Sequence, residues 1–169
     1  MIRLLTAPEL ETNVARFSAI LCDAVQSGAG VSFLWPLDEA GASAYWRSLA
    51  GAVEGGRLFL FAAEIDGTIA GTVQLHKVWP PNQPHRGEIA KLLVHRDYRR
   101  LKLGTGLMRA VEAKARELGL TLITFDAVAH GPVEAFYRGL GFTCVGYIPG
   151  YAYGGDGKLD DTAIFYKQL

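Results

Sequence analysis

Residues 88 to 140 alternate between apolar runs and amphipathic segments, and this alternation constrains the fold more than any other feature of the sequence. Residues 88–95 are apolar enough for a buried strand, and residues 104–118 place their apolar side chains on one helical face. A second buried strand is predicted at 120–128, and a second helix at 132–140 starts with a proline and is followed by a glycine. A βαβα unit of this kind predicts a mixed α/β domain.

The rest of the chain adds helices before this unit and strands on both sides of it. Two apolar runs meet at Asp66-Gly67, a pair suited to the positive φ of a tight hairpin turn. No repeat, low-complexity tract or linker divides the sequence, so one domain over residues 1–169 is expected. The predicted elements here are a strand at 2–7, helices at 8–25 and 37–53, a hairpin over 57–78, and strands at 142–151 and 162–169.

The charges of the chain are balanced, with 17 Lys and Arg residues against 17 Asp and Glu residues. No net field would therefore draw it to nucleic acid or to a membrane, and any anion site must be local. No stretch approaches the ~20 apolar residues of a membrane span, and no signal-peptide core develops, so a cytoplasmic protein is expected. Cys22 and Cys144 are expected to be reduced thiols, and the scattered histidines predict no metal site.

A basic turn leads from the strand at 88–95 into the helix at 104–118. The N-terminus of a helix carries unpaired N–H groups and a partial positive charge, so it can bind a phosphate. Arg99, Arg100 and Lys102 add cationic donors beside it. Alternatively, such a run of charges is solvated surface. We call residues 95–104, HRDYRRLKLG, the phosphate loop.

Two segments of the chain resemble the GNAT superfamily of acyl-CoA-dependent N-acyltransferases. The phosphate loop is similar to the Arg/Gln-x-x-Gly-x-Gly/Ala motif of that family, which follows a strand ending in valine, here Val94. Lys102 stands where the motif has its first glycine. A tyrosine, Tyr137, precedes Leu-Gly-Phe as in a second family segment, although His130 replaces a frequent asparagine. The resemblance covers residues 57–148.

The resemblance implies a mostly antiparallel central sheet of about seven strands flanked by about four helices, with a splay between the fourth and fifth strands. It also implies acetyl-CoA as co-substrate. A phosphate turn needs glycine only where φ is positive or where a side chain would block the anion. If Lys102 keeps an ordinary helical-turn conformation, its backbone N–H still serves, and Gly104 then makes the close approach to the diphosphate. The residues implied in cofactor binding are Leu92, Leu93, Val94, Arg99, Arg100, Leu101, Lys102, Leu103, Gly104, Thr105 and Tyr137.

Acetyl transfer to an amine needs a base, and the sequence offers two candidate carboxylates. Glu88 opens the strand that precedes the phosphate loop, where some family members carry a glutamate, and Asp126 lies near the end of the next buried strand. A carboxylate in a partly apolar cleft would suit this work. Either residue could instead be an exposed strand end. Tyr137 is the candidate acid for the departing thiolate, unless its helical face simply places it in the core.

The acceptor of the acetyl group is expected between two loops that the family uses for this purpose. Phe33 and Trp35 come from the loop between the first two predicted helices, and Tyr151 and Tyr153 from the last hairpin. This hairpin is aromatic and acidic, which would suit a small cationic amine. Alternatively, it is solvated or forms a homodimer contact.

The C-terminal segment also resembles a bacterial subgroup that includes the tabtoxin-resistance acetyltransferases, which implies an amine-bearing metabolite or toxin as acceptor. Two other interpretations stay open. One is acetylation of protein N-termini or lysines, and the other is a catalytically silent acyl-CoA sensor, which would need the phosphate loop but neither Glu88 nor Tyr137.

Overall fold

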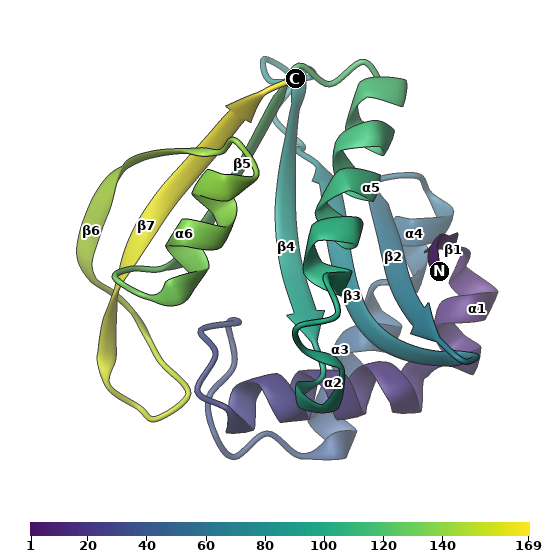
Figure 1. The fold of residues 1–169 in the computed structure, drawn as a ribbon. Coiled ribbons are helices and arrows are strands. Elements are labelled where there is room, and N and C mark those ends of the chain that lie inside the picture. The colour runs from purple at the N-terminus through teal and green to yellow at the C-terminus, as the bar shows by residue number, and fades with distance from the viewer.

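The computed structural model describes residues 1–169 and builds one sheet of seven strands in the order β1-β2-β3-β4-β5-β7-β6 (Figure 1). Every neighbouring pair is antiparallel except β4 and β5, which run parallel as the two strands of the predicted βαβ unit. The mixed α/β, mostly antiparallel fold is therefore confirmed. The strands are β1 Ile2–Leu5, β2 Leu58–Ile65, β3 Thr68–Lys77, β4 Arg86–Val94, β5 Leu122–Val128, β6 Thr143–Tyr153 and β7 Leu159–Gln168.

The helices are more numerous than predicted, because each of the two N-terminal helices is divided in two. Asn13 interrupts the first: its side chain donates to the carbonyl of Glu9 at 2.7 Å and competes with the helical bonding pattern. The second is interrupted at Leu49. The helices are α1 Ala7–Thr12, α2 Val14–Gln26, α3 Glu39–Ser48, α4 Ala50–Glu54, α5 Leu103–Glu117 and α6 Pro132–Gly139, with a 3₁₀ turn at Arg96–Tyr98. No helix is both long and apolar enough to cross a bilayer.

Two hydrophobic cores lie on opposite faces of the sheet. One packs α5 and α6 against the sheet, and α5 covers β2, β3 and β4 (Figure 1). The other is formed by α1, α2 and α3, with Phe17 and Trp46 fully buried at its centre. Because helices cover both faces of the sheet, the sequences of β2 and β3 are nearly continuous apolar runs and do not alternate between apolar and polar residues.

The last two strands are longer than predicted. β6 continues to Tyr153 and β7 begins at Leu159, so the glycine-rich connection shrinks to a tight turn in which the Gly154 N–H donates to the Lys158 carbonyl at 2.8 Å. Pairing between them is irregular from Ile148 to Ala152, and this irregularity lets the ladder pass the proline and glycine of β6.

Candidate active site

The pairing of β4 and β5 stops early, and this leaves one edge of β4 free in the middle of the sheet. The two strands pair only at Arg86, Gly87 and Glu88, and beyond that point they diverge in Figure 1. The predicted splay is therefore present. The free part of β4 includes all three predicted backbone contacts: Leu93 is buried, while Leu92 and Val94 are half-buried. N–H and C=O groups on this edge that face β5 are available to a ligand.

The phosphate loop ends in a helix start with no protein cap. Lys102, the N-cap of α5, has φ 59° and ψ 17°, so it does not keep the ordinary helical-turn conformation considered from the sequence. No side chain caps the helix, and its first turn holds no acidic residue. The first helical bond of α5 runs from the Gly106 N–H to the Lys102 carbonyl, so the N–H groups of Leu103, Gly104 and Thr105 are left for an anion.

Gly104 does not have the left-handed backbone conformation that favours glycine, and a Cβ there would be in ordinary contact with its neighbour. A Cβ at this position would lie 3.4 Å from Cζ of Phe136, on α6. Two other loop residues do take left-handed conformations without being glycine: Arg100 has φ 67° and Lys102 φ 59°. The close approach of Gly104 to the diphosphate stays a prediction, while the left-handed backbone positions of the loop are Arg100 and Lys102.

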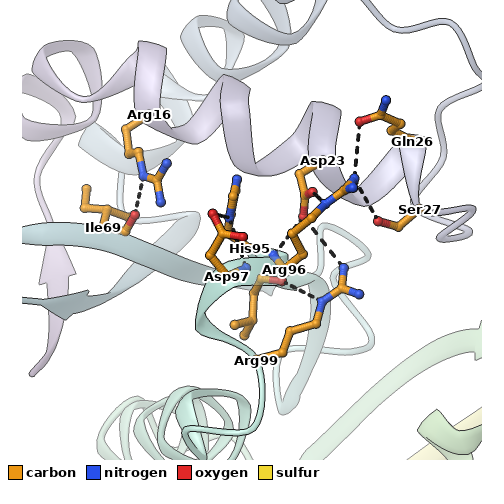
Figure 2. A network of polar contacts seen from close by, with 10 residues as sticks. Arg16, Asp23, Gln26, Ser27, Ile69, His95, Arg96, Asp97 and Arg99 are labelled. Atoms are coloured by element: carbon orange, nitrogen blue, oxygen red, sulfur yellow. Dashed lines mark hydrogen bonds and ion pairs between the residues drawn. The ribbon is translucent and has the colours of Figure 1, made fainter.

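Asp23 of α2 holds the start of the phosphate loop (Figure 2), and sequence reasoning missed it. Its buried carboxylate accepts the Arg96 backbone N–H at 3.0 Å and pairs with the Arg96 guanidinium. Arg99 Nη2 lies 3.7 Å from the same carboxylate, and its Nε donates to the Val94 carbonyl at 3.3 Å. Arg99 therefore points toward α2. The only signal in the sequence was an aspartate within the apolar run Ala19–Val25 of a helix.

Tyr137 of α6 is buried in an aromatic cluster with side chains of β5 and β7, the strands on the far side of the splay from β4. Its ring lies 4.5 Å from that of Phe125 and 5.4 Å from that of Phe165, measured between centroids. Burial, and secondarily the charge of Asp126, raises the pKa of the Tyr137 hydroxyl well above its usual value. The core interpretation of Tyr137 is thus correct for the ring, and the hydroxyl is a neutral hydrogen-bond donor.

The two candidate bases are both exposed to solvent, so neither lies in the partly apolar cleft considered from the sequence. Glu88 is at the last residue pair between β4 and β5, where the splay begins, and Arg86 Nη1 lies 3.3 Å from its carboxylate. Asp126 accepts a hydrogen bond of 3.2 Å from the Thr162 hydroxyl. The structure thus places the two carboxylates on the two strands that border the splay.

A half-buried polar row that the sequence did not reveal lies beside Glu88. The Tyr45 hydroxyl donates to Gln74 at 3.2 Å, and His76 Nε2 lies 2.9 Å from the same amide oxygen. His76 is also the cross-strand neighbour of Glu88. Burial lowers the pKa of His76, and the charge of Glu88 opposes this shift. The row begins on α3, continues along β3 and ends beside Glu88.

The loop at 27–38 spans the open end of the splay. Ser32 Oγ lies 3.3 Å from Nζ of Lys91 on β4, and a Cβ at Gly30 would collide with Val128 at the end of β5. The Trp35 N–H donates to the Gly155 carbonyl at 3.3 Å, which ties the loop to the β6–β7 hairpin. The two segments predicted to surround the acceptor therefore meet.

The four predicted acceptor residues lie in different surroundings. The ring of Phe33 packs against that of Tyr45 at 5.1 Å. Trp35 is 53% exposed and borders a separate pocket of about 510 Å³ between α2 and the phosphate loop. Tyr151 and Tyr153 are exposed on β6. Only Phe33 therefore faces the polar side chains of the site.

Comparison with known proteins gives one family and a consistent set of folds. Residues 25–142 match the model of the acetyltransferase (GNAT) family. The ribosomal-protein-alanine N-acetyltransferase of Brucella melitensis is 21% identical, with a TM-score of 0.82 over 100% of this chain and 99% of that one. An N-acetyltransferase of Staphylococcus aureus is 17% identical, with a TM-score of 0.82 over 99% and 97%. The structure of yncA from Salmonella typhimurium, solved with acetyl-CoA, is 17% identical, with a TM-score of 0.77 over 100% and 93%.

Proposed function

The chain belongs to the acetyltransferase (GNAT) family and is an N-acetyltransferase, and from this premise we propose that it acetylates the primary amine of a small molecule. The observation that carries the proposal is the free edge of β4, which the phosphate loop connects to a helix start without a protein cap. One feature offers backbone groups to an extended ligand and the other offers N–H groups to its phosphate. Together they fit a molecule with a long polar arm and a diphosphate.

The residues present fit acetyl-CoA, which would supply the activated acetyl group as a thioester. Leu92, Leu93 and Val94 would bind its arm through their backbones. The N–H groups of Leu103, Gly104 and Thr105 would hold the diphosphate, and Arg100, Leu101 and Lys102 shape the turn beside it. In this proposal Arg99 is a positioning residue, because its guanidinium is directed to Asp23 and the Val94 carbonyl.

A base for the acceptor amine is available on either side of the splay. We assign it to Glu88 or Asp126, acting directly or through water. Both are open to solvent, which lets a proton leave the site. Glu88 also has His76 as its cross-strand neighbour, and the negative charge of Glu88 partly offsets the effect of burial, which lowers the pKa of His76.

Tyr137 would act on the departing sulfur as a hydrogen-bond donor. Because burial raises the pKa of its hydroxyl, the group stays protonated throughout the physiological range. A thiol normally titrates at about pH 8.5, so complete proton transfer from this phenol to a thiolate would be uphill. Its contribution would therefore be to stabilise the developing thiolate, which finally takes its proton from solvent.

The closure of the loop at 27–38 favours a small acceptor over a protein. Contacts of this loop with Lys91, Val128 and Gly155 join it to both edges of the splay and to the last hairpin. A folded protein substrate would have to displace these contacts. Acetylation of protein N-termini is the second candidate, because the Brucella melitensis structure is named a ribosomal-protein-alanine N-acetyltransferase.

The test is release of the CoA thiol from acetyl-CoA over a panel of small amines and N-terminal peptides. We expect turnover on small amines, and a kcat lower by roughly 10- to 100-fold in Tyr137→Phe with unchanged acetyl-CoA affinity. Glu88→Gln and Asp126→Asn identify the base, whose loss should cost about 100-fold or more. Glu54→Gln, an exposed carboxylate on α4, is the control.

Three outcomes would contradict the proposal. Turnover confined to peptides would replace it with the second candidate. Tight acetyl-CoA binding without turnover of any amine would favour the sensor. Absence of acetyl-CoA binding would remove the co-substrate itself.

A further inference from the structure

Lys91 is a half-buried cation for which the proposed chemistry has no use. It has φ 51° and lies in a β-bulge, where the pairing of β4 with β3 shifts by one residue between Thr72 and Gln74. The extra residue in β4 interrupts the alternation of side chains between the two faces of the sheet. The Lys91 side chain lies on the face covered by α3, next to Tyr45. The bulge immediately precedes Leu92, where the proposed thioester site begins.

Lys91 has aromatic rings and a hydroxyl around its ammonium group but no carboxylate counter-ion. Its Nζ lies 5.7 Å from the ring centroid of Phe33 and 5.6 Å from that of Tyr45, and 3.3 Å from the Ser32 hydroxyl. No carboxylate lies within 4.0 Å. Burial lowers the pKa of Lys91, and the charge of Asp126 opposes this shift. Glu88, Asp126, His76 and Tyr45 are the other titratable groups near the site.

We propose that Lys91 binds an acidic group of the acceptor, so that the substrate is an amphoteric amine such as an amino acid. A partly desolvated ammonium without a carboxylate gains most from a ligand anion that supplies one. The acceptor amine would be placed between the carboxylates that border the splay, and its acid on the aromatic side beside Phe33 and Tyr45. The aromatic and acidic hairpin, which suggested a purely cationic amine, is not needed for this recognition.

This inference rests on the proposed function and narrows it. In a peptide N-terminus the carboxyl group nearest to the amine is an uncharged amide, which would leave Lys91 without an anionic partner. In a free amino acid both charges are present on one small molecule. Lys91 therefore gives a physical reason for choosing a free amino acid over a protein N-terminus.

The experiment compares α-, β- and γ-amino acids with their own carboxamides as acceptors, in the wild type and in Lys91→Met. We expect kcat/KM in the wild type to favour at least one acid over its amide by roughly 10- to 100-fold, the range for one charge-assisted hydrogen bond. Lys91→Met should abolish this preference by slowing the acids alone, with acetyl-CoA affinity and thermal stability retained. Lys77→Met, which removes an exposed lysine from β3, is the matched control and should keep the preference.

Binding provides a readout that does not depend on turnover. Calorimetry with N-acetyl amino acids and their amides, in the presence of CoA, should show the same preference and its loss in Lys91→Met. Equal rates and equal binding for acids and amides in the wild type would overturn the role of Lys91 and leave the acetyltransferase proposal standing. Acetyl-CoA binding with no acetylation of any amine would count against the proposed function, while calorimetry would still decide on Lys91.

Discussion

At the scale of single residues, the site is built from left-handed backbone positions that are not glycine. Lys91, Arg100 and Lys102 all have positive φ, a conformation that costs a side-chain-bearing residue roughly 1–2 kcal/mol. Two of them shape the phosphate loop, and the third makes the bulge beside the proposed thioester site. All three of these strained positions carry a cationic side chain.

The phosphate loop gives a prediction about two neighbouring positions. Lys102→Gly should leave the free energy of unfolding unchanged or raise it by up to ~1 kcal/mol, because glycine adopts the left-handed conformation without strain. It should weaken acetyl-CoA binding only a few-fold, through the loss of one exposed cation. Gly104→Val should weaken acetyl-CoA binding by about tenfold or more. A Cβ there would already contact the Phe136 ring at 3.4 Å, so the two further methyl groups of valine have to displace that ring or cover the N–H groups of the helix start.

Calorimetric titration with acetyl-CoA and urea unfolding of both variants check this pair. Equal losses of affinity would show that the contact with the diphosphate does not depend on the packing of α5 against α6. Instability of Lys102→Gly would contradict the strain argument.

At the scale of secondary-structure elements, α2 and the phosphate loop are joined by the Asp23 cluster shown in Figure 2. Asp23 is buried, and its partners Arg96 and Arg99 come from a segment more than 70 residues later in the chain. The C-terminal end of α2 leads into the loop at 27–38. One carboxylate thus connects the element before the acceptor loop to the element that holds the diphosphate.

Asp23→Asn should lower both stability and acetyl-CoA affinity. The amide can still accept from the Arg96 N–H, but it leaves the guanidinium groups of Arg96 and Arg99 without a charged partner, at a cost of about 1–3 kcal/mol in unfolding free energy. The KM for acetyl-CoA should rise more than the KM for the acceptor, because the displaced segment is the phosphate loop.

Asp97→Asn is the matched control for that experiment. Asp97 belongs to the same loop and pairs with His95 at 3.5 Å, but its side chain is 72% exposed. An exposed pair contributes only about 0–1 kcal/mol, so this variant should resemble the wild type. Identical effects of the two substitutions would show that Asp23 has no special positioning role.

At the scale of the whole molecule, the splay divides the sheet into two parts, with β1 to β4 on one side and β5, β7 and β6 on the other (Figure 1). The two parts are joined by the first residues of the β4–β5 ladder, by helix packing on the sheet and by the loop at 27–38. The polar row that includes His76 lies near this junction, so protonation of His76 changes the stability of the whole fold.

The stability of the protein should fall as the pH drops below about 6.5, the ordinary pKa of histidine. Burial lowers the pKa of His76 in the folded state. As the pH falls, this histidine is therefore protonated in the unfolded state before it is protonated in the folded state, and this favours unfolding. Urea midpoints between pH 5 and 8 should therefore rise with pH, and His76→Gln should flatten part of this slope. His85→Gln, at an exposed histidine, should keep it, and an unchanged slope in His76→Gln would contradict the assignment.

Much of the fold could be predicted because its signals are local. The apolar face of α5, the turn at Asp66-Gly67 and the proline at the start of α6 each depend on residues a few positions apart. The division of the N-terminal helices was missed because Asn13 acts through a side-chain bond to Glu9, which does not disturb the apolar spacing. Strand ends were missed where pairing with a partner, rather than local preference, extends β6 and β7.

The sequence by itself determined the family, the mixed α/β class, the position of the phosphate loop and the candidate carboxylates and tyrosine, because these depend on short motifs and their order. Tertiary structure alone decided the left-handed turn at Lys102, the attachment of Arg99 to Asp23 and the convergence of Phe33, Tyr45 and Lys91. The physical reason is that these features arise from contacts between distant segments. Backbone conformation and side-chain direction at such positions are set by what packs against them, and no local pattern records that.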